Sequence, residues 1–340
     1  MSRELRFGVI GLGYWGPRIV RNLALDPRIA LACVADLHQE RCEAIARQYP
    51  YASATTDAEE LLDDPHLDAI VIATPASTHF ELAMAAIDRG KHVLVTKPLA
   101  DSVAKAEKLV AAAGSAGVVL LVDHTFAYTG AVEKMRELVH QRFLGDIYYF
   151  DSVRVNLGLF QQDVNVIWDL AAHDFSILDQ VLPEKPNAVQ VVAVQRASRT
   201  FEDIAYVTVF YPSGMLAHVH VSWLSPVKIR STLVGGSERM LLWDDLAPDE
   251  KLKIYDHGVS LSEGDVEGVY QMLVDYRIGD IWIPHIDRGE ALTKEVAHFV
   301  DCIDGNAEPR TGGESGLRVV QLLMASSLSV EREGERVALT

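Results

Sequence analysis

The chain has 340 residues, 49% hydrophobic and 23% charged, a composition that predicts a folded protein with enough chain for two domains. Its 31 lysines and arginines stand against 48 aspartates and glutamates, giving a formal net charge of -17. This charge repels polyanions at long range and argues against nucleic acid or a membrane surface as a partner. Three scattered cysteines, Cys33, Cys42 and Cys302, predict neither a disulfide framework nor a metal site, and we expect a cytoplasmic protein.

The first third of the chain alternates short β-branched segments with helical patterns. The predicted strands are residues 6–10, 29–36, 68–74, 91–98 and 118–122, and the predicted helices are residues 16–25, 39–49, 79–90 and 102–117. Strict alternation requires crossover connections, so the sheet should be mostly parallel and covered by helices on both faces. We therefore expect a doubly wound α/β domain over residues 1–122.

From residue 123 the pattern changes to many strands with few helices between them. The predicted helices are residues 132–142, 168–182, 290–305 and 314–333, and the predicted strands are residues 146–155, 188–197, 204–211, 215–224, 228–236, 239–246 and 252–259. The Pro-Ser-Gly segment at 212–214 predicts a hairpin turn. We expect residues 123–340 to form an α/β domain with a large, mainly antiparallel open sheet, whose last helices are free to pack on the first domain.

A glycine motif follows the first predicted strand and opens the first predicted helix. In GVIGLGYWGP, Gly11 allows a tight turn, Gly13 lets the backbone approach a diphosphate, and Gly16 allows close packing of the helix. In this context the motif predicts a Rossmann dinucleotide site. The residues expected to hold the cofactor there are Gly11, Leu12, Gly13, Tyr14, Trp15 and Gly16.

An acidic residue ends the second predicted strand. Asp36 lies twenty residues after Gly16, where a carboxylate accepts hydrogen bonds from ribose hydroxyls. The same carboxylate would repel the 2′-phosphate of NADP, and the residues directly after it, Leu37 to Gln39, include no arginine. We therefore predict that the cofactor is NAD.

A carboxylate and an imidazole interrupt an apolar run in WDLAAHDF. Asp169 and His173 are four residues apart, so a helix would present both on one face. Taken alone, the octapeptide also fits a helix-capping aspartate followed by a buried structural histidine.

Two longer segments carry a family resemblance. Together with WDLAAHDFSILD, the segment ATPASTHFELAMAAIDRGKHVLVTKPLA resembles the glucose-fructose oxidoreductase / inositol dehydrogenase / MocA (Gfo/Idh/MocA) family, which joins a Rossmann domain to an α/β domain with an open sheet. The resemblance covers essentially the whole chain. With GYWGP and MLLWDDLAPDEKLKIYD included, it is nearest to the branch that oxidises nucleotide sugars of the UDP-N-acetylglucosaminuronate type.

The resemblance implies roles for particular residues. The family's catalytic Lys-Pro motif falls on Lys97 and Pro98, and its Asp and His fall on Asp169 and His173. The backbone that passes beneath the dinucleotide corresponds to Thr74 and Pro75, and the histidine at the start of the following helix corresponds to His79. The residue before the lysine, commonly Glu in the family, is Thr96 here, so a hydroxyl replaces a charge at a cofactor contact.

The chemistry of alcohol oxidation agrees with these positions. A base must remove the hydroxyl proton while hydride leaves carbon for the nicotinamide. Our hypothesis is that His173 removes this proton, Lys97 orients and polarises the hydroxyl, and Asp169 binds substrate or tunes the pair. Either Lys97 or His173 could be the base, because both are able to titrate near neutral pH in such a setting.

Three other residues are weaker candidates. Trp168 is expected to pack on the nicotinamide, although an aromatic residue in a helix is more often part of the core. Arg154 and Asn156, on the strand before WDLAAHDF, are expected to bind a substrate carboxylate or phosphate, although exposed arginines are common. No metal ligand set stands out.

Three activities remain open at this level. The first is oxidation of a nucleotide sugar, the second is oxidation of a free polyol such as an inositol, and the third is glycoside hydrolysis that uses NAD redox-neutrally. The expected partners are a small sugar substrate and further copies of the chain, in a homodimer or homotetramer.

Overall fold

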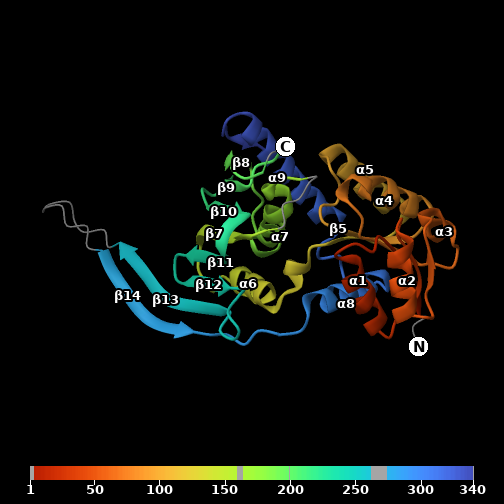
Figure 1. The fold of residues 1–340 in the computed structure, drawn as a ribbon. Coiled ribbons are helices and arrows are strands. Elements are labelled where there is room, and N and C mark those ends of the chain that lie inside the picture. Colours follow the sequence, from red (N-terminus) through yellow and green to blue (C-terminus); the bar gives the residue numbers. More distant parts are fainter. Residues whose placement is uncertain (1–3, 159–163, 199, 262–273, 340) are drawn as a thin grey trace, which may run out of the picture. The chain divides into compact units, whose positions relative to one another are not determined.

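The computed structural model describes residues 4–158, 164–198, 200–261 and 274–339 (Figure 1). Two compact units divide the chain: unit 1 comprises Met1–Thr129 and Gly289–Met324, and unit 2 comprises Gly130–Arg288 and Ala325–Thr340. We placed the domain boundary at residues 122 and 123 from the sequence. The first segment of unit 1 continues to Thr129, and most of the last two helices also belong to unit 1.

Unit 1 contains a parallel sheet of six strands in the order β3-β2-β1-β4-β5-β6. The strands are β1 Leu5–Ile10, β2 Ile29–Ala35, β3 Ser53–Thr55, β4 Ala69–Ile72, β5 His92–Thr96 and β6 Leu120–Asp123. This is the strand order of a Rossmann fold, so the predicted doubly wound domain is confirmed. Strands β1, β4 and β5 run next to one another, which brings their carboxyl ends to one edge of the sheet.

Helices cover both faces of this sheet (Figure 1). They are α1 Gly16–Leu25, α2 Gln39–Gln48, α3 Ala58–Asp63, α4 His79–Asp88, α5 Val103–Ala116, α8 Ala291–Ile303 and the first part of α9 Gly313–Glu331. One core joins the sheet to α1, α2 and α8, and includes an edge-to-face contact between Phe7 and Phe299 with ring centroids 5.7 Å apart. The other core joins the opposite face to α3, α4 and α5.

Unit 2 contains a sheet of nine strands in the order β14-β13-β12-β11-β7-β10-β9-β8-β15. The strands are β7 Ile147–Leu157, β8 Ala188–Val194, β9 Ile204–Phe210, β10 Leu216–Ser222, β11 Leu224–Gly236, β12 Met240–Asp244, β13 Leu252–Leu261, β14 Val274–Trp282 and β15 Val337–Ala338. Among the described residues only β7 and β10 pair in parallel; the other neighbours are antiparallel. The prediction of a large, mainly antiparallel sheet is confirmed.

Two helices of unit 2 precede and follow β7. Helix α6 spans Gly130–His140 and α7 spans Ala172–Val181. The strands of this sheet alternate buried and exposed residues, as β9 does with Val207 buried and Tyr206 46% exposed. One face of the sheet is therefore covered and the other is partly open, which is common for an antiparallel sheet.

Four short or late elements were absent from our predictions. Strand β3 has three residues, β15 has two, and α3 has six, all too short for a hydrophobic period to be recognised. Strand β14 pairs with β13 and was also missed.

The hairpin turn expected at residues 212–214 does join β9 to β10, with Gly214 at φ +90°. Within the described part of the chain, no helix is both long enough and apolar enough to cross a membrane.

Candidate functional site

The loop between β1 and α1 needs glycine at two positions because of the backbone itself. Gly11 has φ +97°, and a Cβ atom there would lie 2.5 Å from the carbonyl oxygen of Ala73. A Cβ on Gly16 would lie 2.2 Å from the carbonyl oxygen of Gly11. The loop can therefore close tightly between β4 and the first turn of α1 only if both residues lack a side chain.

Gly13 is different, because a Cβ atom added to it would meet nothing within 4 Å. It lies just before the N-terminus of α1, where unpaired backbone N–H groups favour an anion. No acidic residue lies in the first turn of this ten-residue helix. Open space beside Gly13 and a helix N-terminus without competing charge fit the diphosphate of a dinucleotide.

The two aromatic residues of this loop have different surroundings. Tyr14 is 76% exposed, and the guanidinium of Arg18 lies 4.1 Å from the centre of its ring. Trp15 is half-buried, and its indole N–H donates to the carboxylate of Asp123 at the end of β6. Trp15 thus ties the cofactor loop to a strand three positions away in the sheet, which the sequence motif did not indicate.

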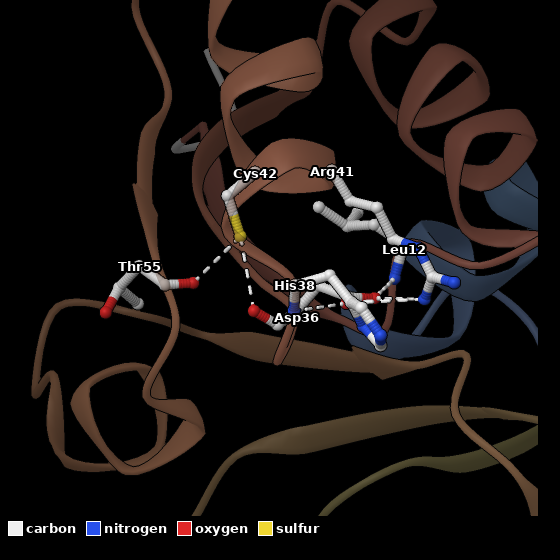
Figure 2. Close-up of polar contacts among 6 residues, drawn as sticks. All are labelled: Leu12, Asp36, His38, Arg41, Cys42 and Thr55. Carbon is white, nitrogen blue, oxygen red and sulfur yellow. Dashed lines mark hydrogen bonds and ion pairs between the residues drawn. The ribbon is translucent and has the colours of Figure 1, made fainter.

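Asp36 follows β2 and its carboxylate is held by backbone and side-chain donors (Figure 2). Leu12 of the glycine loop donates its backbone N–H at 2.7 Å, and His38 donates its backbone N–H at 2.9 Å. Burial alone would raise the pKa of Asp36, but these hydrogen bonds and the contact with Arg41 outweigh it, so its pKa lies below the usual value. Asp36 is therefore a fixed, ionised acceptor beside the glycine loop.

Arg41 is a residue that our sequence reasoning missed. We looked for an arginine only at residues 37 to 39, yet the Arg41 guanidinium lies 3.3 Å from both carboxylate oxygens of Asp36 (Figure 2). Helix α2 begins at Gln39, so Arg41 is in its first turn and reaches back to the end of β2. The Asp36 carboxylate, which we expect to select NAD over NADP, is thus paired with the Arg41 cation.

His79, at the start of α4, is only 1% exposed. Its Nδ1 lies 2.8 Å from the carbonyl oxygen of Pro98 and its Nε2 lies 2.9 Å from that of Thr74. The Thr96 hydroxyl is also 3.3 Å from Nε2. Burial lowers the pKa of His79, although the contacts with both carbonyl oxygens favour the protonated ring, and the imidazole joins the Thr74 loop to the turn after β5. A role of His79 in cofactor binding stays a prediction.

Lys97 immediately follows β5, at the carboxyl edge of the parallel sheet where open α/β sheets bind ligands. Its side chain is half-buried, and the peptide bond that joins it to Pro98 is cis. Thr74 and Pro75 follow the adjacent strand β4 at the same edge. Unit 1 therefore groups the glycine loop, Thr74 and Lys97 at the ends of three neighbouring strands.

Asp169 lies in a π-helical turn, Ile167–Ala171, and not in the continuous α-helix that we predicted. The side-chain oxygen of Asn165 accepts the backbone N–H groups of Ile167 and Trp168, both at 3.1 Å, and so begins the turn. Helix α7 starts directly afterwards at Ala172 and carries His173. Single π-helical turns are often found at functional sites, because they change the direction of one or two side chains.

Side chains remote in sequence hold this turn. The indole N–H of Trp223 donates to Asp169 Oδ2 at 3.0 Å, and the indole N–H of Trp168 donates to the Ser327 hydroxyl at 2.9 Å. We predicted Trp168 as a nicotinamide contact; its indole N–H is directed to Ser327, and stacking of its ring on the nicotinamide stays a prediction. Sequence reasoning did not identify Trp223, which gave no local signal beyond being an aromatic residue at a strand end.

Arg154 on β7 is buried, with 5% of its surface exposed. It donates to the carboxylate of Asp174 on α7, with Nε 2.8 Å from Oδ2, and the Ser152 hydroxyl donates to the same carboxylate at 2.6 Å. This ion pair explains how a buried arginine is tolerated there, and it excludes the alternative of an ordinary exposed arginine. Substrate binding by Arg154 stays a prediction. Asn156, two residues further along β7, is half-buried.

The predicted residues therefore fall into two groups, one in each unit. The glycine loop, Asp36, Thr74, His79 and Lys97 belong to unit 1, whereas Arg154, Asn156, Trp168, Asp169 and His173 belong to unit 2. Among the described residues, no group of three or more His, Cys, Asp or Glu side chains is placed to hold a metal ion.

Comparison with known proteins gives the family. The model of the Gfo/Idh/MocA oxidoreductases with an NAD-binding Rossmann fold matches residues 5–124, and the model of the Gfo/Idh/MocA C-terminal domain matches residues 132–241. A UDP-N-acetylglucosamine 3-dehydrogenase from Acidithiobacillus ferrooxidans is 27% identical, over 96% of this chain and 98% of its own. A myo-inositol 2-dehydrogenase from Thermotoga maritima is 23% identical, over 97% of both chains.

A solved structure supports the fold over the full length. The crystal structure of GenD2 from gentamicin A biosynthesis in complex with NAD superposes with a TM-score of 0.83 at 24% identity, covering 100% of this chain and 97% of that one. The chain described here belongs to the Gfo/Idh/MocA family of oxidoreductases, and its first domain is an NAD-binding Rossmann domain.

Proposed function

We propose that this protein oxidises a secondary hydroxyl group of a sugar, preferentially of a nucleotide sugar. NAD, when bound, supplies the chemistry of hydride acceptance at its nicotinamide ring. The observation that carries the proposal is the π-helical turn, which holds a hydrogen-bonded Asp169 four residues before His173. A carboxylate and an imidazole held in this way provide the groups that alcohol oxidation needs for binding and for proton transfer.

The residues of the chain divide the work as follows. The backbone of the glycine loop binds the diphosphate of the dinucleotide, and Asp36 binds its adenosine ribose. Lys97 binds and polarises the reacting hydroxyl, and His173 removes its proton. Asp169 binds substrate or orients His173. The alternative assignment exchanges the roles of Lys97 and His173, because both side chains can accept a proton.

The preference for a nucleotide sugar is supported by the full-length similarity to a UDP-N-acetylglucosamine 3-dehydrogenase. The full-length similarity to a myo-inositol 2-dehydrogenase supports a second candidate, a free polyol. Both reactions use the same groups at the reacting carbon. They differ in whether the protein also binds the diphosphate of the substrate. Because the chain as a whole is acidic, binding this anion requires positively charged residues close to it.

The test is an initial-rate assay of the purified protein with NAD and a panel of UDP-N-acetylhexosamines, their uronic acids and free inositols. Formation of NADH with a UDP-linked member supports the proposal, and formation with inositols alone supports the polyol alternative. Release of free sugar from a glycoside without net NADH would instead identify a redox-neutral hydrolase and overturn the proposed oxidation.

Variants assign the residues. Lys97→Ala and His173→Ala are each expected to lower turnover by about 100-fold or more while leaving NAD binding unchanged. Lys108→Ala on α5 and His140→Ala on α6 are matched controls, since each removes an exposed side chain of the same kind from the same unit. Near-normal turnover in either active-site variant would contradict its assigned role.

A further inference from the structure

We propose that Trp223 is a positioning residue for Asp169, with its indole N–H setting the direction in which the carboxylate points. This inference rests on the proposed function, because it takes Asp169 to act in the reaction. Trp223 lies between β10 and β11, far from the glycine loop and from Lys97 in the chain, and it makes its contact entirely within unit 2.

The contact joins a fully enclosed donor to a half-exposed acceptor. Trp223 is 1% exposed and donates from Nε1 to Asp169 Oδ2 at 3.0 Å, a normal length for a hydrogen bond. Asp169 itself is half-buried, and its Oδ2 accepts this hydrogen bond. A carboxylate rotates easily about its last bond, and a fixed donor on one oxygen limits that rotation.

The indole is itself fixed from two sides. A Cβ atom on Gly158 would lie 2.6 Å from Cδ1 of Trp223, so the ring packs closely on the backbone at the end of β7. The Gly158 N–H donates to the Trp223 carbonyl at 3.1 Å, and the Trp223 N–H donates to the Asp203 carbonyl at 3.0 Å. The donor can therefore not follow the carboxylate if the latter turns away.

The surroundings of Asp203 add to this rigidity. Its buried carboxylate accepts the backbone N–H groups of Arg196, Ala197 and Ser198, with the nearest oxygens 3.0, 2.6 and 2.9 Å away. These hydrogen bonds connect the loop after β8 to the residue whose carbonyl holds Trp223. The π-helical turn fixes the backbone of Asp169, whose N–H donates to the Asn165 carbonyl at 3.1 Å. Trp223 fixes the direction of the Asp169 side chain.

The experiment is a double-mutant cycle of Trp223→Phe and Asp169→Asn, with Trp243→Phe as matched control. Phenylalanine keeps an aromatic ring but removes the pyrrole part of the indole, including its N–H donor. Trp243 on β12 is equally buried, at 2% exposed, and among the described residues its indole N–H meets no hydrogen-bond acceptor. The control therefore reproduces the loss of ring volume without the loss of a hydrogen bond.

We expect Trp223→Phe to lower kcat by about 10- to 100-fold, the range for a hydrogen bond to a charged group. The dissociation constant for NAD should stay unchanged, since the glycine loop and Asp36 lie in the other unit. In the Asp169→Asn background, Trp223→Phe should cause little further loss, because the two residues act as one unit.

Three results would count against this assignment or its basis, and they are distinguishable. Normal kcat in Trp223→Phe, or losses that simply multiply in the double variant, would overturn the role of Trp223. Full activity in Asp169→Asn would instead refute the role of Asp169 in the proposed function. Should Trp223→Phe fail to fold, Gly158→Ala decides: it keeps the indole but displaces it, so a normal kcat overturns the inference and a lowered kcat with unchanged NAD binding supports it.

Discussion

The glycine loop of unit 1 and the Asp169 turn of unit 2 are both short segments at a strand-to-helix connection, yet they are held in different ways. The loop is shaped by backbone contacts, with Gly11 and Gly16 packed against carbonyl oxygens of Ala73 and Gly11. The turn is held by side chains that are distant in sequence, since Trp223 is 54 residues from Asp169 and Ser327 is 159 residues from Trp168. A segment shaped by its backbone is sensitive to side chains that are added, whereas a segment held by remote partners is sensitive to side chains that are removed.

The largest expected effect is in unit 2, from removal of a buried partner. Asp174→Ala should lower the free energy of unfolding by about 3 to 5 kcal/mol, because it leaves the buried Arg154 guanidinium without its carboxylate. Chemical denaturation measures the loss. Glu137→Ala, which breaks an exposed pair with Lys134 on α6, should cost less than about 1 kcal/mol. Equal losses in the two variants would contradict this difference.

Adding a methyl group to unit 1 should come next. Gly11→Ala should destabilise the protein by about 2 to 4 kcal/mol, because it combines a left-handed φ with a clash against Ala73. Gly13→Ala should leave stability unchanged but weaken NAD binding by about tenfold or more, since its methyl group would occupy the space beside the diphosphate. Denaturation and NAD titration on both variants separate the two effects, and unchanged NAD binding in Gly13→Ala would remove Gly13 from the site.

A third prediction concerns the choice of cofactor at Asp36. Asp36→Ala should weaken NAD binding by about tenfold and strengthen NADP binding, because it removes the ribose acceptor and frees Arg41 for a 2′-phosphate. Arg41→Ala in the same background should abolish the gain for NADP. Titration of each variant with both dinucleotides measures this. If NADP binds equally well with and without Arg41, the arginine takes no part in the selection.

The smallest effect, taken per pH unit, is a pH dependence of stability in unit 1. Glu295 on α8 is fully buried, and this burial together with the neighbouring Asp123 carboxylate raises its pKa well above the usual range. The unfolded chain loses this proton above about pH 4.5 while the folded chain keeps it, so stability falls as pH rises from there toward the folded pKa.

Glu295→Gln removes this titration and should therefore be stabilising at pH 8 relative to the parent, with little difference at pH 4. The difference in free energy of unfolding between the variant and the parent should grow by at most about 1.4 kcal/mol per pH unit. Urea denaturation across this range measures it. A difference that is constant from pH 4 to pH 8 would show that Glu295 does not take up a proton on folding.

The same contrast explains which expectations from the sequence were accurate. The parallel sheet of unit 1 and the antiparallel sheet of unit 2 follow from hydrophobic patterns that repeat along the chain. The π-helical turn escaped prediction, because apolar spacing alone does not distinguish one wider turn from an α-helix. The buried His79 ring lies between two carbonyl oxygens, contacts that no local pattern predicted and that form because β4 and β5 lie side by side.

The sequence alone determined the character of the glycine loop and the order of strand and helix, since backbone sterics and hydrophobic periodicity act over a few residues. Only the tertiary structure decided that Trp223 orients Asp169, that Arg41 pairs with Asp36, and that Arg154 is buried against Asp174. These pairs depend on strand register and on where a helix begins relative to a strand end. Such quantities are properties of packed elements and are not contained in any short segment of the chain.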